Sequence, residues 1–159
     1  MALFKPTKYI IKADEITPLW CNENNVKGII LDTDNTLSVH GSQMPADGIL
    51  SWIDSLKKSG IKLVILSNNT KQRIEPFAKI LDIPFVVNGA KPLKTGFKAC
   101  FNILKLKKEE IIIIGDQIFT DILGGNRFKI RTILCSPIQL ESGFFFKVKR
   151  KAEKLFFKI

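Results

Sequence analysis

The chain of 159 residues has a net charge of +10, and 45% of its residues are hydrophobic. This length suits one domain with its own core, and this hydrophobic content excludes a disordered chain. The charge is concentrated at the ends, because residues 1–12 contribute +3 and residues 143–159 contribute +5, which leaves +2 for the body. Basic ends are commonly solvated, but they can also contact an anionic surface.

The cysteines and the apolar segments indicate the compartment. Cys21, Cys100 and Cys135 are scattered and odd in number, so they indicate neither a disulfide framework nor a zinc site. We therefore expect reduced, packed thiols in a cytoplasmic protein. Lysines interrupt the N-terminal region and no apolar run reaches transmembrane length, which predicts neither a signal peptide nor a membrane span.

Short apolar runs alternate with helical patterns along the chain. The runs predicted as buried strands are 28–32, 61–66, 84–87, 111–114 and 130–134. The helices are expected in the segment that begins at Thr17-Pro18, at 46–58, from Lys71 onward, at 93–104 and after Asp121. This alternation is typical of a doubly wound α/β fold. We predict a single domain, residues 1–159, with a mostly parallel five-stranded sheet.

Two features of the connecting segments have structural explanations. His40 lies in a predicted loop, where a surface position is expected more often than a ligand or a base. The pair Gly124-Gly125 predicts the C-terminal end of a helix, with a glycine in the left-handed conformation. Arg127, two residues later, is a minor candidate for contact with an anionic substrate.

Polar residues follow the predicted strands and form one ordered set. In chain order they are Asp32 and Asp34, then Ser67, Lys91, Asp116 and Asp121. Because the carboxyl ends of parallel strands form the edge where open α/β sheets bind ligands, we expect these side chains to share a site. Taken singly, each has a structural explanation as a turn residue, a helix cap or a solvated lysine.

These residue types have the chemistry of phosphoryl transfer. One carboxylate can attack phosphorus and form an aspartyl phosphate, and a second can protonate the leaving oxygen and then activate water. A hydroxyl and an ammonium can bind the phosphoryl oxygens. Carboxylates can also bind Mg²⁺, which offsets the repulsion between an anionic nucleophile and a phosphate.

The ordered set resembles the four motifs of the haloacid dehalogenase (HAD) superfamily of phosphatases. The matching stretches are Leu31-Asp32-Thr33-Asp34-Asn35-Thr36, Ser67 in Leu-Ser-Asn-Asn, Lys91 in Ala-Lys-Pro, and Gly115-Asp116-Gln117 with Thr120-Asp121. The resemblance implies a HAD-like fold in which Asp32 is the nucleophile and Asp34 is the acid/base.

The same resemblance implies the remaining roles at the site. The residues that would bind the substrate phosphate are Thr33, Ser67, Asn68 and Lys91. The Mg²⁺ ligands would be Asp32, Asp34 through its backbone carbonyl, and Asp116. Asp121 would support the site.

The cap and the substrate follow from a narrower resemblance. Superfamily members often carry a cap domain, but 37–45 offers only a short flap, so we expect an open mouth that accepts large substrates or borrows a lid from another subunit. Residues 115–127 and the late Gly143-Phe-Phe resemble the YqeG-type branch of subclass IIIA, which includes mitochondrial phosphatidylglycerophosphate phosphatases. Phosphatidylglycerophosphate is therefore the implied substrate, and a soluble sugar phosphate or nucleotide is the alternative.

The segment 143–159 has an amphipathic pattern. Its apolar stripe at helical spacing consists of Val148, Ala152, Leu155, Phe156 and Ile159, and six basic residues surround that stripe. The segment could pack on the body with the stripe inward. It could instead lie on an anionic membrane, at the inner face, as a peripheral contact.

Two classes without catalysis remain as alternatives, a nucleic-acid-binding protein and an inactive scaffold. The sequence lacks aromatic-rich RNA-binding motifs and its body is not basic, so no nucleic acid is expected as a partner. The expected residues of all four motifs are present, including the acids of the first and the fourth, which argues against an inactive scaffold. An oligomer is compatible with the open mouth.

Overall fold

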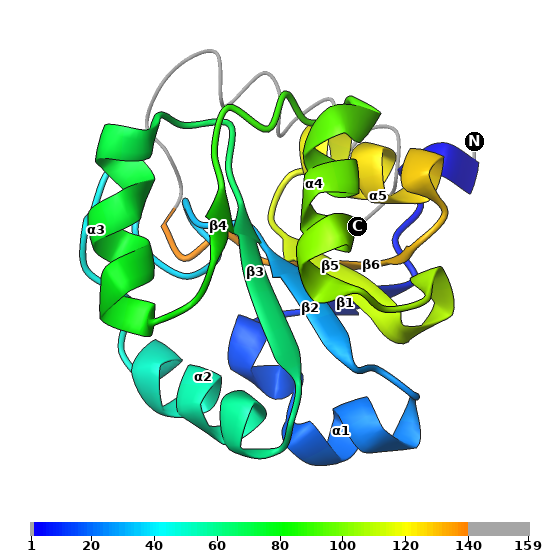
Figure 1. The fold of residues 1–159 in the computed structure, drawn as a ribbon, viewed down its shortest axis with the longest axis horizontal. Helices are drawn as coiled ribbons and strands as arrows, with labels where there is room; N and C mark the ends of the chain where they lie inside the picture. Colours follow the sequence, from blue (N-terminus) through cyan, green and yellow to red (C-terminus); the bar gives the residue numbers. More distant parts are fainter. Residues whose placement is uncertain (1, 140–159) are drawn as a thin grey trace.

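Six parallel strands form the centre of the computed structural model, which describes residues 2–139, and they run in the order β1-β6-β5-β2-β3-β4 (Figure 1). The strands are β1 (Lys8–Ile10), β2 (Gly28–Leu31), β3 (Lys62–Leu66), β4 (Phe85–Val86), β5 (Ile111–Gly115) and β6 (Arg131–Cys135). The doubly wound parallel sheet is confirmed, and each of the five predicted strands begins and ends within one residue of its predicted bounds. The predicted strand count was wrong, because there are six strands.

The strand that sequence analysis missed is β1. Only Ile10 of its three residues is buried, so it lacks the apolar run that identifies the other strands. It pairs with β6, with Lys8 opposite Ile133 and Tyr9 opposite Leu134. Pairing with a buried neighbour, rather than the sequence of β1 itself, therefore fixes this edge strand.

Helices cover both faces of the sheet. They are α1 (Pro18–Glu23), α2 (Ile49–Lys58), α3 (Lys71–Leu81), α4 (Lys94–Leu104) and α5 (Leu123–Phe128), with short 3₁₀ turns at Ala2–Phe4, Ala13–Glu15 and Lys108–Glu110 and a π-helical turn at Ile118–Ile122. Helix α2 begins three residues later than predicted, since Gly48 before it has a φ of 83°.

Two apolar clusters, one on each face, hold these layers together. On one face Ile29 and Leu31 of β2 pack with α1, α2 and α3, and on the other Ile30 packs with α4 and α5 (Figure 1). Burial on both faces explains why β2, β3 and β5 are continuous apolar runs. Their carboxyl ends all meet at one edge, where the polar residues of the motifs follow.

The described chain contains no inserted cap domain. One helix, α2, connects β2 to β3, and one helix, α3, connects β3 to β4. No helix between residues 2 and 139 is long and apolar enough to cross a membrane. The segment 143–159, with its predicted amphipathic helix, lies outside the described residues.

All three cysteines are buried and unpaired, as predicted. Burial raises the pKa of the Cys21 thiol to about 11 and that of Cys100 to about 12. The pKa of Cys135 is also raised, first by burial and then by the nearby Asp116 carboxylate. These thiols are packing groups rather than nucleophiles.

Helix α5 continues through Gly124-Gly125 to Phe128, and Lys129, which follows it, has a φ of 65°. The predicted helix end at the glycines was therefore wrong. A Cβ at Gly124 would lie 2.5 Å from the Phe97 ring and 3.2 Å from the Cα of Pro92, and one at Gly125 would lie 2.5 Å from Cγ2 of Thr132. The glycines let α5 approach α4 and the sheet closely.

We expect Gly124→Ala to lower the free energy of unfolding by about 1–3 kcal/mol, because the added methyl group overpacks the contact with Phe97. In a helix alanine is more favourable than glycine by about 1 kcal/mol, so helix propensity alone would raise the free energy of unfolding. The sign of the measured change in this free energy therefore separates the effect of packing from that of helix propensity. Urea denaturation measures it, with Thr95→Ala at an exposed position of α4 as the control. A more stable Gly124→Ala protein would contradict the packing argument.

Candidate active site

Asp32 is fixed by the sheet at the point where β2 ends. Its backbone N–H still donates to the carbonyl of Ile114 in β5, at 3.0 Å. Its side chain is 12% exposed, and Oδ1 accepts a hydrogen bond from Nζ of Lys91 at 2.6 Å. The hydroxyl of Thr36 donates to Oδ2 at 3.2 Å. The nucleophile predicted from the sequence is thus a buried carboxylate held by two donors.

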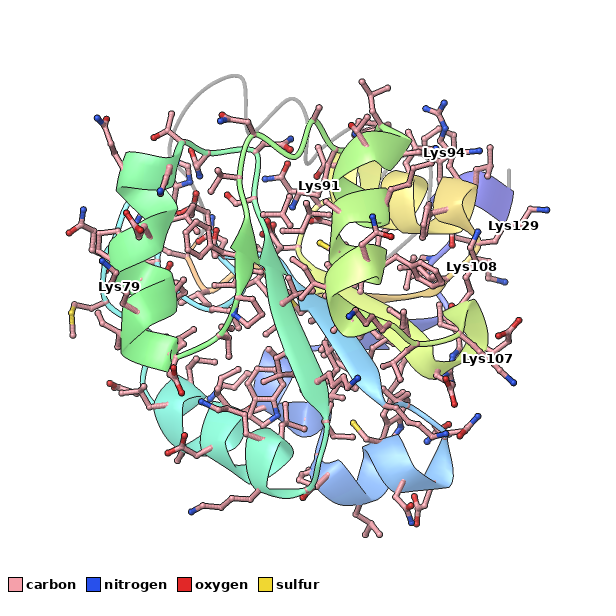
Figure 2. All side chains as sticks on the ribbon, in the orientation of Figure 1. Lys79, Lys91, Lys94, Lys107, Lys108 and Lys129 are labelled. Atoms are coloured by element: carbon pink, nitrogen blue, oxygen red, sulfur yellow. The ribbon has the colours of Figure 1, made fainter. Side chains whose placement is uncertain are left out.

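Lys91 links two of the buried acids. Its Nζ donates to Oδ1 of Asp32 at 2.6 Å and to Oδ1 of Asp121 at 2.7 Å. Burial alone would lower the pKa of Lys91, but the carboxylates of Asp121 and Asp32 raise it above its usual range. The ammonium therefore stays charged, and Figure 2 shows Lys91 beside α4 near the carboxyl ends of the strands.

Asn68 holds the backbone of Lys91 on both sides. The Lys91 N–H donates to Oδ1 of Asn68 at 2.8 Å, and Nδ2 of Asn68 donates to the Lys91 carbonyl at 3.1 Å. The structure therefore uses this side-chain amide to place Lys91. The phosphate contact expected of Asn68 from the sequence stays a prediction.

Asp116 and Asp121 complete an acidic cluster with Asp32. All three residues are buried, and each offers a carboxylate oxygen within 4.8 Å of the others. The π-helical turn brings Asp121 back over the end of β5, where Oδ2 accepts the Gln117 N–H at 3.1 Å. A Cβ at Gly115 would lie 2.3 Å from that Oδ2, so only glycine leaves room for Asp121 here.

The cluster fits a divalent cation with oxygen ligands. Three buried carboxylates lie together and two of them accept from the Lys91 ammonium, and hard cations such as Mg²⁺ prefer carboxylate oxygens. Burial raises the pKa of Asp32 to about 6. The Lys91 ammonium lowers this pKa in part, whereas the neighbouring carboxylates of Asp121 and Asp34 raise it further. A bound cation would offset this unfavourable concentration of negative charge.

The side chain of Asp34 lies apart from that cluster. Its Oδ1 accepts hydrogen bonds from Nη2 of Arg73 at 2.9 Å and from the Gly41 N–H at 3.2 Å. Its Oδ2 accepts one from Nδ2 of Asn69 at 2.7 Å. The structure thus separates the two acids of the first motif, and an expected metal contact of Asp34 would involve its backbone carbonyl.

Arg73 and Asn69 are site residues that sequence reasoning missed. Asn69 lies in the Leu-Ser-Asn-Asn stretch but was given no role of its own, and Arg73 was not singled out because a basic residue on a helix is usually solvated. The signal that could have found Arg73 is its place in the first turn of α3, directly after a strand end that carries a motif. His40 lies 3.9 Å from Oδ2 of Asp34 with 53% of its side chain exposed, so its predicted exposure is confirmed.

Ser67 and Thr33 lie at the same edge of the sheet. Ser67 is buried, and its Oγ accepts the Asn69 N–H at 3.1 Å. The Thr33 Oγ1 is buried and finds no hydrogen-bond partner among residues 2–139. A buried hydroxyl in that state is suited to a ligand oxygen. The contacts of both residues with phosphate stay predictions.

We expect Asp32→Asn to raise the melting temperature of the EDTA-treated protein at about pH 7.5. Unfolded aspartate has a pKa of about 3.9, whereas folded Asp32 has a raised pKa of about 6. The folded state therefore binds more protons between these values and loses stability as the pH rises through them. Asparagine is neutral, so the Asp32→Asn protein does not lose this stability as the pH rises.

Thermal unfolding at about pH 4.5 and about pH 7.5 measures this difference, which should be larger at the higher pH. The exposed Asp54→Asn on α2 is the matched control. An Asp32→Asn protein that melts below the wild type at both pH values would contradict the effect of buried charge.

Comparison with solved structures shows where this fold occurs. A haloacid dehalogenase-like hydrolase from Brucella suis 1330 aligns with a TM-score of 0.62 at 9% identity, over 79% of this chain and 88% of that one. The cobalt-bound deoxy-D-mannose-octulosonate 8-phosphate phosphatase from Haemophilus influenzae aligns with a TM-score of 0.54 at 16% identity, over 85% of this chain and 89% of that one. At these identities, the likeness is one of fold.

Comparison of sequences is more specific. A family model for haloacid dehalogenase-like hydrolases matches residues 32–129, which run from Asp32 to the end of α5 and include all four motifs. The "Probable phosphatase YqeG" of Bacillus subtilis (strain 168) is 38% identical over 151 residues, which make up 95% of this chain and 88% of that protein. On both grounds, this chain belongs to the haloacid dehalogenase-like hydrolase family.

Proposed function

We propose that this protein is a Mg²⁺-dependent phosphatase that hydrolyses a phosphomonoester through an aspartyl phosphate on Asp32. The observation that carries the proposal is the placement of Lys91 between Asp32 and Asp121, within a buried acidic cluster at the ligand-binding edge of the sheet. The sequence relative from Bacillus subtilis, which is named as a phosphatase, supports it.

Each residue has a defined part in the reaction. A carboxylate oxygen of Asp32 attacks phosphorus, the ester P–O bond breaks, and Asp34 gives its proton to the leaving oxygen. Water then attacks the phosphorus of the aspartyl phosphate and transfers a proton to Asp34, which releases inorganic phosphate and the Asp32 carboxylate. The Lys91 ammonium counters the charge on the phosphoryl oxygens throughout.

The acidic cluster would hold the metal. Asp32 and Asp116 are the side chains proposed as ligands, with the backbone carbonyl of Asp34. Asp121 already accepts from Lys91 and from the Gln117 N–H, so it orients the ammonium and supports the cluster. When bound, Mg²⁺ supplies positive charge that lets an anionic nucleophile approach an anionic phosphate.

We expect Asp32→Asn to abolish phosphate release from 4-nitrophenyl phosphate, because an amide is a poor nucleophile. EDTA should silence the wild-type protein and Mg²⁺ should restore it, whereas Ca²⁺ should be a poor substitute because it prefers longer bonds and more ligands. The control is Asp54→Asn, which changes an exposed acid on α2 and should leave the activity normal. Near-normal turnover by Asp32→Asn, or by the metal-free wild type, would refute the mechanism.

We propose phosphatidylglycerophosphate as the substrate, cleaved at the inner, cytoplasmic face of a membrane. The resemblance to the subclass IIIA branch supports it, and so does the absence of a cap domain between residues 2 and 139, since an open mouth can reach a lipid head group. A soluble sugar phosphate or nucleotide is the alternative.

The end of the described chain supports a membrane role for 143–159. The Ile138 N–H donates to the carbonyl of Asn35 at 3.0 Å, and the Gln139 N–H donates to Oδ1 of Asn35 at 3.2 Å. The described chain therefore ends beside the motif that contains Asp32 and Asp34, and 143–159 follows that end in the sequence. Helix α4 carries Lys94, which Figure 2 labels, and Lys98; both are exposed, and the helix contains no acidic residue.

We expect a chain ending at Ser142 to bind anionic vesicles of phosphatidylglycerol and phosphatidylcholine less tightly than the full-length protein. Each basic residue near such a surface contributes about 1 kcal/mol, and the deletion removes six of them. Hydrolysis of the lipid should slow, while hydrolysis of 4-nitrophenyl phosphate should not change. Vesicle co-sedimentation and phosphate release measure these effects.

Thermal unfolding of both chains is the control for folding. Equal, weak binding of the two chains to vesicles would refute the membrane role. Failure to cleave the lipid, together with rapid turnover of a sugar phosphate or nucleotide, would favour the soluble substrate.

A further inference from the structure

The carboxylate of Asp34 is bound by three donors from three different segments. Arg73 comes from the first turn of α3, Asn69 from the turn after β3, and Gly41 from the flap between β2 and α2. Only 13% of the Asp34 side chain is exposed. A carboxylate with this many protein partners is held in one orientation, whereas an exposed acid would sample several.

Arg73 is itself well fixed. Its side chain is 19% exposed, and its backbone N–H donates to the Thr70 carbonyl at 3.1 Å in the first turn of α3. A guanidinium remains charged at all ordinary pH values and keeps a rigid planar set of donors. The pair with Asp34 therefore differs from an exposed surface ion pair, which contributes little.

Asn69 is tied to the second motif. Its backbone N–H donates to Oγ of Ser67 at 3.1 Å, and its carbonyl accepts the Asn88 N–H at 3.0 Å. The amide that contacts Oδ2 of Asp34 is thus built on the same turn as a predicted phosphate-binding residue. Any shift of Asp34 relative to Ser67 would break the contact at 2.7 Å.

We infer that Arg73, together with Asn69, is a positioning residue that orients Asp34 and leaves its Oδ2 as the oxygen that transfers the proton. Oδ1 accepts two hydrogen bonds, from Arg73 and from Gly41, whereas Oδ2 accepts one, from Asn69. Oδ2 therefore keeps a lone pair for the proton. The inference rests on the proposed phosphatase function, and Arg73 acts through Asp34 without touching the substrate.

The leaving group provides a readout that a purely structural role would not affect. Phenolate is a stronger base than 4-nitrophenolate, so its departure depends more on a proton from Asp34. Loss of orientation at Asp34 should therefore slow phenyl phosphate more than 4-nitrophenyl phosphate. The ratio kcat/KM is the quantity to compare, because it reports the steps up to departure of the leaving group.

The experiment compares Arg73→Gln and Arg73→Lys with the wild type on both substrates. We expect Arg73→Gln to lower kcat/KM for phenyl phosphate on the order of 10-fold more than for 4-nitrophenyl phosphate, with Arg73→Lys recovering part of the loss. In an Asp34→Asn background the added effect of Arg73→Gln should vanish, since both changes act on the same proton transfer.

Lys79→Gln is the matched control. Lys79 is a basic residue on the same helix with an exposed side chain, and Figure 2 shows it on the outer side of α3. This change should leave both substrates unaffected. Asn69→Ala removes the other side-chain donor and should give the same leaving-group dependence, which keeps the test decisive if an Arg73 variant fails to fold.

Three outcomes would overturn the inference. Equal losses on the two substrates would make Arg73 a structural residue, and a raised KM with unchanged kcat would make it a substrate contact. Full additivity with Asp34→Asn would separate its action from Asp34. An inactive wild-type protein would refute the proposed phosphatase function itself, whereas an active wild type without a leaving-group effect would refute only the positioning role.

Discussion

The Lys91 ammonium lies 2.6 Å from one carboxylate and 2.7 Å from another, in an interior from which water is largely excluded. Without it, Asp32 and Asp121 would face one another as buried like charges, which is costly at low dielectric. Many features of the site serve this placement. Asn68 binds the Lys91 backbone on both sides, and Gly124 lets α5 pack against Pro92, the residue after Lys91.

The three carboxylates of the cluster carry more negative charge than the Lys91 ammonium neutralises, and this excess affects both stability and function. The raised pKa of Asp32 shows that the folded protein holds this carboxylate ionised at a cost. A site that binds a divalent cation needs such a surplus, since a fully neutralised cluster would have little affinity for an ion. The same surplus would repel a phosphate, so the proposed mechanism requires both a bound cation and the ammonium before an anionic substrate can approach Asp32.

The sequence predicted the parts of this structure that depend on local pattern. Ile29-Ile30-Leu31 and Ile111–Ile114 are buried on both faces, so their apolar runs identified them as central strands. Strand β1 could not be found in this way, because pairing with β6 defines it. Arg73 was missed because its role depends on a partner 39 residues away, and Gly124 was misread because its role is close packing against Phe97.

The two acids of the first motif show how one short turn creates two chemical environments. Asp32 still belongs to the sheet ladder, so its side chain lies in the acidic cluster with Lys91. Asn35 has a φ of 59°, and the carbonyl of Thr33 accepts the N–H groups of Leu37 and Ser38, so the chain leaves the strand direction at once. Asp34 therefore faces the flap and α3, where neutral and charged donors orient it. A nucleophile benefits from a fixed position beside an ammonium and a proton carrier from a hydrogen-bonded position that orients it, and the turn provides both within three residues.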